Sequence, residues 1–176
     1  LTAYGLPYSN MKPAGNLPNA EYRRFESMLE YEAVIDSLIP LTQNVIRVFD
    51  KTPSRAFNSP QRHETLSRFL LASRTNRLTI ILHETETLER NCPRLILLLR
   101  QFSHAVSIRQ TLRMARHVYD PFVIFDASHY VHRFHYDHLR AAQGTHDVLG
   151  AQQLLDRFEE ILEASVPAVS ASVSGL

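Results

Sequence analysis

The sequence has 176 residues, 44% of them hydrophobic and 21% charged. This length and composition fit one globular domain that buries a core without disulfides. The 19 basic and 18 acidic residues nearly balance, so the chain has no overall field that attracts nucleic acid or an anionic membrane.

The cysteine content and the lengths of the apolar runs bear on where in the cell the protein is expected. Cys92 is the one cysteine in the chain, which excludes an internal disulfide and favours a reducing environment. No apolar run approaches the roughly 20 residues of a membrane span, and the first residues do not resemble a signal peptide. We therefore expect a cytoplasmic protein without a membrane partner. The chain begins at Leu1 rather than Met, and the sequence leaves open whether it is part of a longer protein.

The N-terminal part of the chain is predicted to be an arm. Residues 1–24 contain three prolines and two glycines and show neither helical nor strand periodicity. We interpret them as an extended arm or linker.

The middle of the chain alternates helical and strand patterns. Apolar spacing predicts a helix from Glu26 to Leu41, and Ser59 before Pro60 predicts the start of another, with Ser59 as its N-cap. Pro93 is expected to divide or bend a helix within residues 85–102. Apolar runs of strand length predict strands at Val45–Phe49, Leu78–Leu82 and Ala105–Arg109.

The last third is predicted to contain a hairpin and a helix. Phe122–Phe125 and His129–Phe134 have strand patterns, and the turn chemistry of residues 126–128 separates them. Asp147 is expected to cap a closing helix. The aromatic and apolar residues expected to point into packed layers are Phe122, Ile124, Tyr130 and Phe134.

This order of elements predicts an α/β fold with a mixed, mostly parallel sheet, helices on both faces and an antiparallel hairpin. We expect a single domain over residues 25–165, after the arm of residues 1–24, and a frayed tail over residues 166–176.

The hairpin and the closing helix suggest a family. The strand ending in Phe125-Asp126, a turn, a second strand and a helix carrying Phe158–Leu162 resemble one half of a phospholipase-D-like fold. In that superfamily an HxKxxxxD motif supplies the catalytic His and Lys, and two motifs, from two halves or two subunits, meet in one phosphodiester-cleaving site. Placing Asp126 on the motif's Asp puts Tyr119 at the His and Pro121 at the Lys.

The segment from Asp126 to Phe134 and the closing helix also resemble an uncharacterised bacterial domain family related to phospholipase D, sometimes joined to acetyltransferase-like domains. That resemblance implies a degenerate, non-catalytic scaffold. Covalent phosphoryl transfer needs a nucleophile and a neighbouring cation, and Tyr119 with Pro121 does not supply that pair. We therefore expect neither catalytic residues nor a cofactor.

Basic side chains near the hairpin form a candidate phosphate site, since arginine suits phosphate geometry. The candidate ligand-binding residues are Arg113, Arg116, His117, Asp126 and Arg133. The alternative, which we favour, is a solvated polar face with salt bridges to Asp120 and Asp137.

Four histidines recur at every third position from His129 to His138, and imidazoles are common zinc ligands. Successive strand positions face opposite sides of a sheet, so we expect solvent-facing histidines and no metal. Ser128 lacks the sequence context of a catalytic serine.

Two classes of function remain. The first, which we favour, is a non-catalytic interaction or oligomerisation module that pairs with itself, as a homodimer, or with a protein partner. The alternative is a binding module for a phosphate-bearing ligand, a nucleic acid or nucleotide. An active phosphodiesterase is the least favoured.

Overall fold

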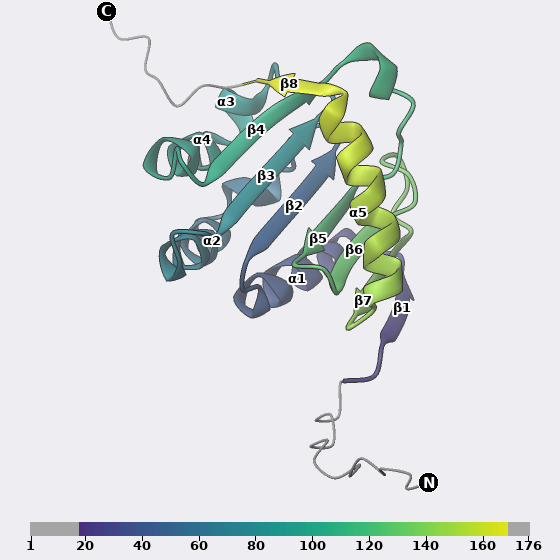
Figure 1. Ribbon diagram of the computed structural model, residues 1–176. Helices are drawn as coiled ribbons and strands as arrows, with labels where there is room; N and C mark the ends of the chain where they lie inside the picture. The colour runs from purple at the N-terminus through teal and green to yellow at the C-terminus, as the bar shows by residue number, and fades with distance from the viewer. Residues whose placement is uncertain (1–17, 169–176) are drawn as a thin grey trace, which may run out of the picture.

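The computed structural model describes residues 18–168 (Figure 1). Its strands form an eight-stranded sheet in the order β1-β7-β6-β5-β2-β3-β4-β8. The strands are β1 (Glu21–Phe25), β2 (Val45–Asp50), β3 (Arg77–Leu82), β4 (Val106–Thr111), β5 (Phe122–Phe125), β6 (His129–Arg133), β7 (Ala141–Thr145) and β8 (Ser165–Pro167). The α-helices are α1 (Met28–Leu38), α2 (Pro60–Ala72), α3 (Leu88–Asn91), α4 (Pro93–Gln101) and α5 (Val148–Glu163). Short 3-10 helices are η1 (Ile39–Leu41), η2 (Arg55–Asn58) and η3 (Arg113–Ala115).

The sheet is mixed, but the prediction that it is mostly parallel is wrong. β3 pairs in parallel with β2 and with β4, as predicted for these three strands. The other neighbouring pairs are antiparallel. Parallel neighbours require a crossover helix, and α2 with α3–α4 provides the crossovers that join β2, β3 and β4. After β4 the chain continues through β5, β6 and β7 as antiparallel neighbours, and β1 closes that side of the sheet.

Local chemistry explains where the helices begin. The Ser59 hydroxyl accepts a hydrogen bond from the Arg62 amide at the start of α2, and the Asp147 carboxylate accepts one from the Gly150 amide at the start of α5. Such caps satisfy amides that have no intrahelical partner. Pro93 divides the helix predicted within residues 85–102 into α3 and α4, as the proline position suggested.

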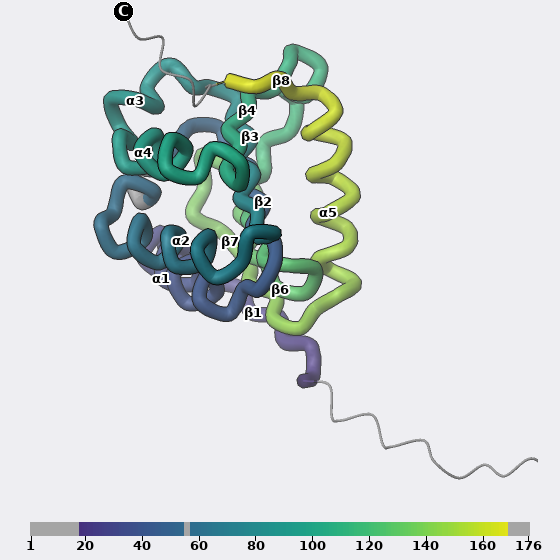
Figure 2. The backbone as a smooth tube through the Cα atoms, turned by 60° about the vertical axis from the view of Figure 1, so that its left-hand side comes forward, coloured from purple at the N-terminus to yellow at the C-terminus, as the bar shows by residue number. Residues whose placement is uncertain are grey.

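The sheet lies between two layers of helices (Figure 2). Apolar residues of α1, α2 and α4 pack in one core cluster with inward-facing residues of the strands. On the opposite face, α5 buries Ala151, Leu154, Phe158 and Ile161 against a second cluster that contains Phe122 and Tyr130. None of the helices between residues 18 and 168 has both the length and the apolar character needed to cross a membrane.

Three strands were not predicted. β1 includes residues 21–24, which the sequence pattern assigns to the arm. β7 follows the hairpin, and β8 includes residues 166–167 of the expected tail, paired with β4. The expectations for residues 1–17 and 169–176 lie outside the described residues.

The hairpin itself is confirmed, with β5 and β6 antiparallel. Phe122, Ile124 and Tyr130 are buried, as predicted, whereas Phe134 is 39% exposed. Phe134 follows the last residue of β6, so the alternation of the strand no longer places its side chain. The histidines of the strand also differ from the expectation of solvent exposure, because His129 is buried and His132 is half-buried.

Candidate functional site: the carboxyl end of β2 and the groove beside α5

Asp126 fixes the position of the hairpin relative to β2. Its carboxylate accepts hydrogen bonds from the backbone amides of Gln43, Asn44 and Val45 at 2.8–3.0 Å. These amides precede or begin β2, so Asp126 lies at the amino end of that strand. It also has a left-handed backbone, with φ 54°, which Asp tolerates better than most residues.

Residues 119–121 lie at the other end of β2. Phe122 pairs with Phe49 and Phe125 pairs with Ile46, so the chain before β5 reaches the carboxyl end of β2. At about 3.3 Å per residue, Asp126 and Pro121 are separated by roughly 16 Å. Asp126 is therefore remote from the end of the sheet where the His and Lys of the motif would lie.

Tyr119 and Pro121 occupy those two motif positions. The Tyr119 ring is stacked on the His135 ring, with centroids 5.6 Å apart, and makes an edge contact with Tyr136. Tyr119 remains 48% exposed. Pro121 contributes its carbonyl oxygen, which accepts a hydrogen bond from the Arg133 amide. An aromatic stack thus stands where the resemblance would place a phosphoryl nucleophile.

A cavity of about 280 Å³ opens beside this stack. We call it the vestigial pocket, and it is lined by Asp50, Lys51, Thr52, Ser54, Arg133, Tyr136 and Asp137. The Lys51 ammonium lies 4.4 Å from the centre of the Tyr136 ring. Arg133 donates to the carbonyls of Tyr136 and His138. Its buried Nε atom has no hydrogen-bond partner among the described residues.

Asp50 is the most unusual group in the vestigial pocket, because it is a buried carboxyl group without an ion pair among residues 18–168. Burial raises its pKa from 3.8 to about 6, although the Lys51 amide, which donates to it at 2.7 Å, and the Arg133 charge act in the opposite direction. Perturbed carboxyl groups in cavities are frequent at functional sites. Asp50 and Lys51 directly follow the apolar run of residues 45–49, which is the signal in the sequence that would have found them.

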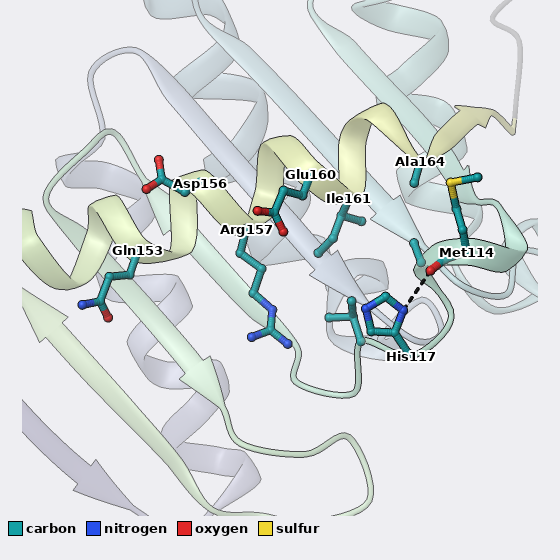
Figure 3. Close-up of a pocket in the computed structure, with 10 residues that line it drawn as sticks. Met114, His117, Gln153, Asp156, Arg157, Glu160, Ile161 and Ala164 are labelled. Carbon is teal, nitrogen blue, oxygen red and sulfur yellow. Dashed lines mark hydrogen bonds between the residues drawn. The ribbon is translucent and has the colours of Figure 1, made fainter.

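A second, larger cavity of about 530 Å³ lies on the opposite face of the sheet, between α5 and residues 114–118 (Figure 3). We call it the α5 groove. His117 and Met114 form one wall, and Gln153, Arg157 and Glu160 extend from α5 on the other. The His117 Nδ1–H donates to the Met114 carbonyl at 2.8 Å.

A polar network lies under the α5 groove. The Asp120 carboxylate accepts hydrogen bonds from Arg157 at 2.5 Å and from His132 Nε2 at 2.7 Å. We missed this network in the sequence, because Arg157 is 37 residues away from Asp120. We predicted that arginines near the hairpin bind Asp120 and Asp137. Among the described residues, Asp120 instead binds Arg157 of α5, and Asp137 lies near His135.

Buried His83 holds the wall of the α5 groove. Its Nε2–H donates to the Val118 carbonyl at 2.7 Å, and its Nδ1 accepts from the Thr111 hydroxyl at 2.6 Å. Burial lowers the pKa of His83, mainly because a charged imidazole would be desolvated there. A neutral imidazole satisfies both bonds and ties the segment after β4 to the end of β3.

The structure does not gather the five predicted ligand-binding residues at one place. Arg133 lines the vestigial pocket, and His117 lines the α5 groove. Arg113 begins η3 and Arg116 follows it; both are exposed and line neither cavity. Asp126 lies at the opposite end of the sheet, bound to backbone amides.

The histidines of the hairpin region are also dispersed. His132 binds Asp120, whereas the His129 ring contacts His146, and His135 contacts His138. Burial, followed by the proximity of His146, lowers the pKa of His129. Within the described residues, no three His, Cys, Asp or Glu side chains are arranged to hold a metal ion.

A family model covers most of the chain. The model described as "Domain of unknown function (DUF7931)" matches residues 31–171. The chain belongs to the DUF7931 family. No protein of curated function matches the sequence significantly.

Solved structures show that this DUF7931 domain has a phospholipase-D-like fold. Nuc, a phospholipase D family member from Salmonella typhimurium, superposes with TM-score 0.61 at 13% identity, covering 86% of this chain and 100% of Nuc. TrmBL2, an archaeal chromatin protein, superposes with TM-score 0.63 at 12% identity, and the match covers 84% of this chain and 54% of TrmBL2. Phosphatidylserine synthase from Haemophilus influenzae superposes with TM-score 0.56 at 18% identity, and the match covers 93% of this chain and 43% of the synthase. The chain thus spans all of Nuc but only about half of the other two proteins.

Proposed function

We propose that this DUF7931 domain is a non-catalytic interaction module that pairs with a second copy of itself through the face around the vestigial pocket. The observation that carries the proposal is the Tyr119 ring, half-exposed and stacked on His135 at the motif position of the catalytic histidine. A stacked aromatic surface suits burial by a partner. With Pro121 at the lysine position, we expect no hydrolysis of phosphodiesters such as bis-p-nitrophenyl phosphate.

The composition of this face supports pairing. Leu139 is 51% exposed and follows His138, whose ring contacts the His135 ring. Arg133 and Lys51 contribute long side chains with apolar stems. Aromatic residues and arginine are enriched in protein interfaces.

The extent of the structural matches supports a second copy as the partner. The domain corresponds to a whole Nuc chain, but to less than half of phosphatidylserine synthase. In a phospholipase-D-like site two halves meet, and two-fold pairing of two copies of this domain would bring two such halves together.

Sedimentation or light scattering over a range of concentrations tests this proposal. We expect dimers that persist at high salt, because apolar pairing is insensitive to screening. Tyr119→Glu should give monomers. Leu29→Glu is the matched control, since Leu29 is exposed on α1 and does not line the vestigial pocket. A monomeric wild type, or equal effects of the two variants, would refute pairing through this face.

A second candidate function is binding of a phosphate-bearing ligand, a nucleic acid or nucleotide, in the vestigial pocket. Its support is the unpartnered Nε of Arg133 next to Lys51, together with the fold shared with TrmBL2, whose structure was described as showing a novel mode of DNA binding. Arg113, Arg116 and His117 would reach only a ligand that extends beyond this pocket.

Fluorescence anisotropy with a labelled single-stranded oligonucleotide tests this candidate. Binding should weaken steeply as salt rises, because phosphate contacts release counterions. Lys51→Met should weaken it further, whereas Arg68→Met, an equal change of charge on α2, should not. Salt-insensitive binding, or equal effects of the two substitutions, would contradict a phosphate site in this pocket.

A further inference from the structure

The α5 groove has an apolar floor that solvent reaches. Ala115, Val118 and Ile161 are buried beneath it, and Met114 at its edge is 71% exposed. Methionine adapts its shape to an incoming group, and a cavity of this size accommodates side chains or a small molecule. The groove therefore favours an occupant with an apolar part.

The charges around the α5 groove favour a cation. Its lining contains one arginine, Arg157, one histidine, His117, and two carboxylates, Asp156 and Glu160. Arg157 is already bonded to Asp120, so it does not attract a further anion strongly. Glu160 is exposed and makes no ion pair among the described residues.

The position of the carboxylates on α5 strengthens this argument. Glu159, Glu160 and Glu163 lie in the last two turns of the helix. The final turn contains no basic residue. The carboxyl end of a helix is the negative end of its dipole, so carboxylates there are unfavourable. A positively charged partner would remove that unfavourable interaction.

We propose that the α5 groove is a docking site for a basic segment of a partner protein. A lysine or arginine side chain would lay its methylene groups over Met114 and Ile161, with its charge at the Glu160 carboxylate, as long basic side chains do on apolar surfaces. The groove lies on the face of the sheet opposite the vestigial pocket. Docking here is therefore independent of pairing through Tyr119.

Methyl NMR on the full chain labelled at methionine tests the proposal. The probe is a short peptide of alternating lysine and leucine, compared with a glutamate–leucine peptide of equal length. We expect the basic peptide to shift the Met114 methyl signal and to leave Met28, which packs against the other core cluster, unchanged. Binding should weaken as salt rises.

Two substitutions on adjacent residues localise the contact. Glu160→Gln should weaken peptide binding by about two- to fivefold, the loss expected for one exposed ion pair. Glu159→Gln makes the same change of charge on an exposed residue that does not line the groove, and it should have little effect. Both side chains are exposed, so both variants should fold.

Several results would overturn the proposal: failure of the basic peptide to bind, shifts at Met28 without shifts at Met114, or equal losses from the two substitutions. A shift of Met114 on addition of the acidic peptide or of a single-stranded oligonucleotide would also overturn it, because the occupant would then be an anion.

Discussion

The Asp126 carboxylate accepts a hydrogen bond from the backbone amide of Asn44, 82 positions earlier in the chain, at 2.8 Å. An acidic residue in a turn commonly binds amides within that turn. Instead it joins the β5–β6 hairpin to the residues that lead into β2. This bond sets the hairpin against the central strand, and thereby places Tyr119 at the carboxyl end of β2.

Asp126→Ala should therefore destabilise the domain by about 2–4 kcal/mol, because three backbone amides lose a charged acceptor and alanine is strained at a positive φ. Asp126→Asn should cost less, since asparagine tolerates this backbone and keeps one acceptor oxygen. Urea unfolding of both variants measures the difference. A loss below about 0.5 kcal/mol for Asp126→Ala, the scale of a neutral surface change, would mean that the amides find water instead.

Asp50→Asn should stabilise the domain at neutral pH. The pKa of Asp50 is about 6 in the folded protein and 3.8 ordinarily, so the folded state holds more protons between these values and the free energy of unfolding falls as pH rises through this window. The variant avoids that loss. Its advantage should be near zero below pH ~4 and reach about 3 kcal/mol above pH ~7.

The free energies of unfolding of the wild type and Asp50→Asn must be compared at the same pH, because His83 and His129 change stability with pH in the opposite direction to Asp50. Their pKa values are lowered by burial, so the unfolded state binds protons first and stability falls as pH drops below about 6.5. Unfolding curves of the wild type and the variant at matched pH remove this shared contribution. An advantage independent of pH would show that the carboxylate charge is not its source.

Phe122→Ala and His132→Ala compare the loss of a buried aromatic side chain with the loss of a side-chain hydrogen bond in the hairpin. Phe122 is fully buried between Phe49 and Phe158, and its loss should cost about 3–5 kcal/mol. A solvent-facing histidine, as expected from the sequence, would make His132→Ala nearly neutral. The bond from His132 to Asp120 now predicts a loss of about 1–2 kcal/mol. Thermal melts should rank the variants in this order, with exposed His138→Ala close to wild type.

The sequence predicted the elements whose patterns are local. β2, β3 and β5 are apolar runs, and α2 and α5 begin at recognisable caps, so their existence follows from the residues themselves. β1 was missed because Glu21, Arg23 and Arg24 give it no apolar periodicity. Its strand conformation comes from pairing with β7, which is a tertiary effect.

The candidate sites were less predictable for a related reason. Arg133 and Asp50 share a cavity although they are far apart in the chain, and Arg157 reaches Asp120 from another element. Proximity in sequence grouped Arg113 and Arg116 with Arg133, but only Arg133 lines the vestigial pocket. Sequence identified the residue types that suit phosphate or partners, and only the register of the strands decided which of them meet.

The Tyr130 ring lies against Gly144 on the neighbouring strand, where a Cβ atom would come within 2.3 Å of the ring. The ring is not free to move away, because it is buried and its hydroxyl donates to Asp147 at 2.7 Å. Gly144→Ala should therefore destabilise the domain by about 1–3 kcal/mol, as overpacking does, although alanine is ordinarily the better strand residue.

A double-mutant cycle with Tyr130→Phe isolates the cause of that loss. Phenylalanine lacks the hydroxyl that ties the ring to Asp147, so the ring yields more easily to an added methyl group. Gly144→Ala should then cost less in the Tyr130→Phe background than in the wild type, and urea unfolding of the four proteins gives the coupling energy. If Gly144→Ala is neutral or stabilising in the wild type, Gly144 is not required by the ring, and the absence of a side chain in β7 has another origin.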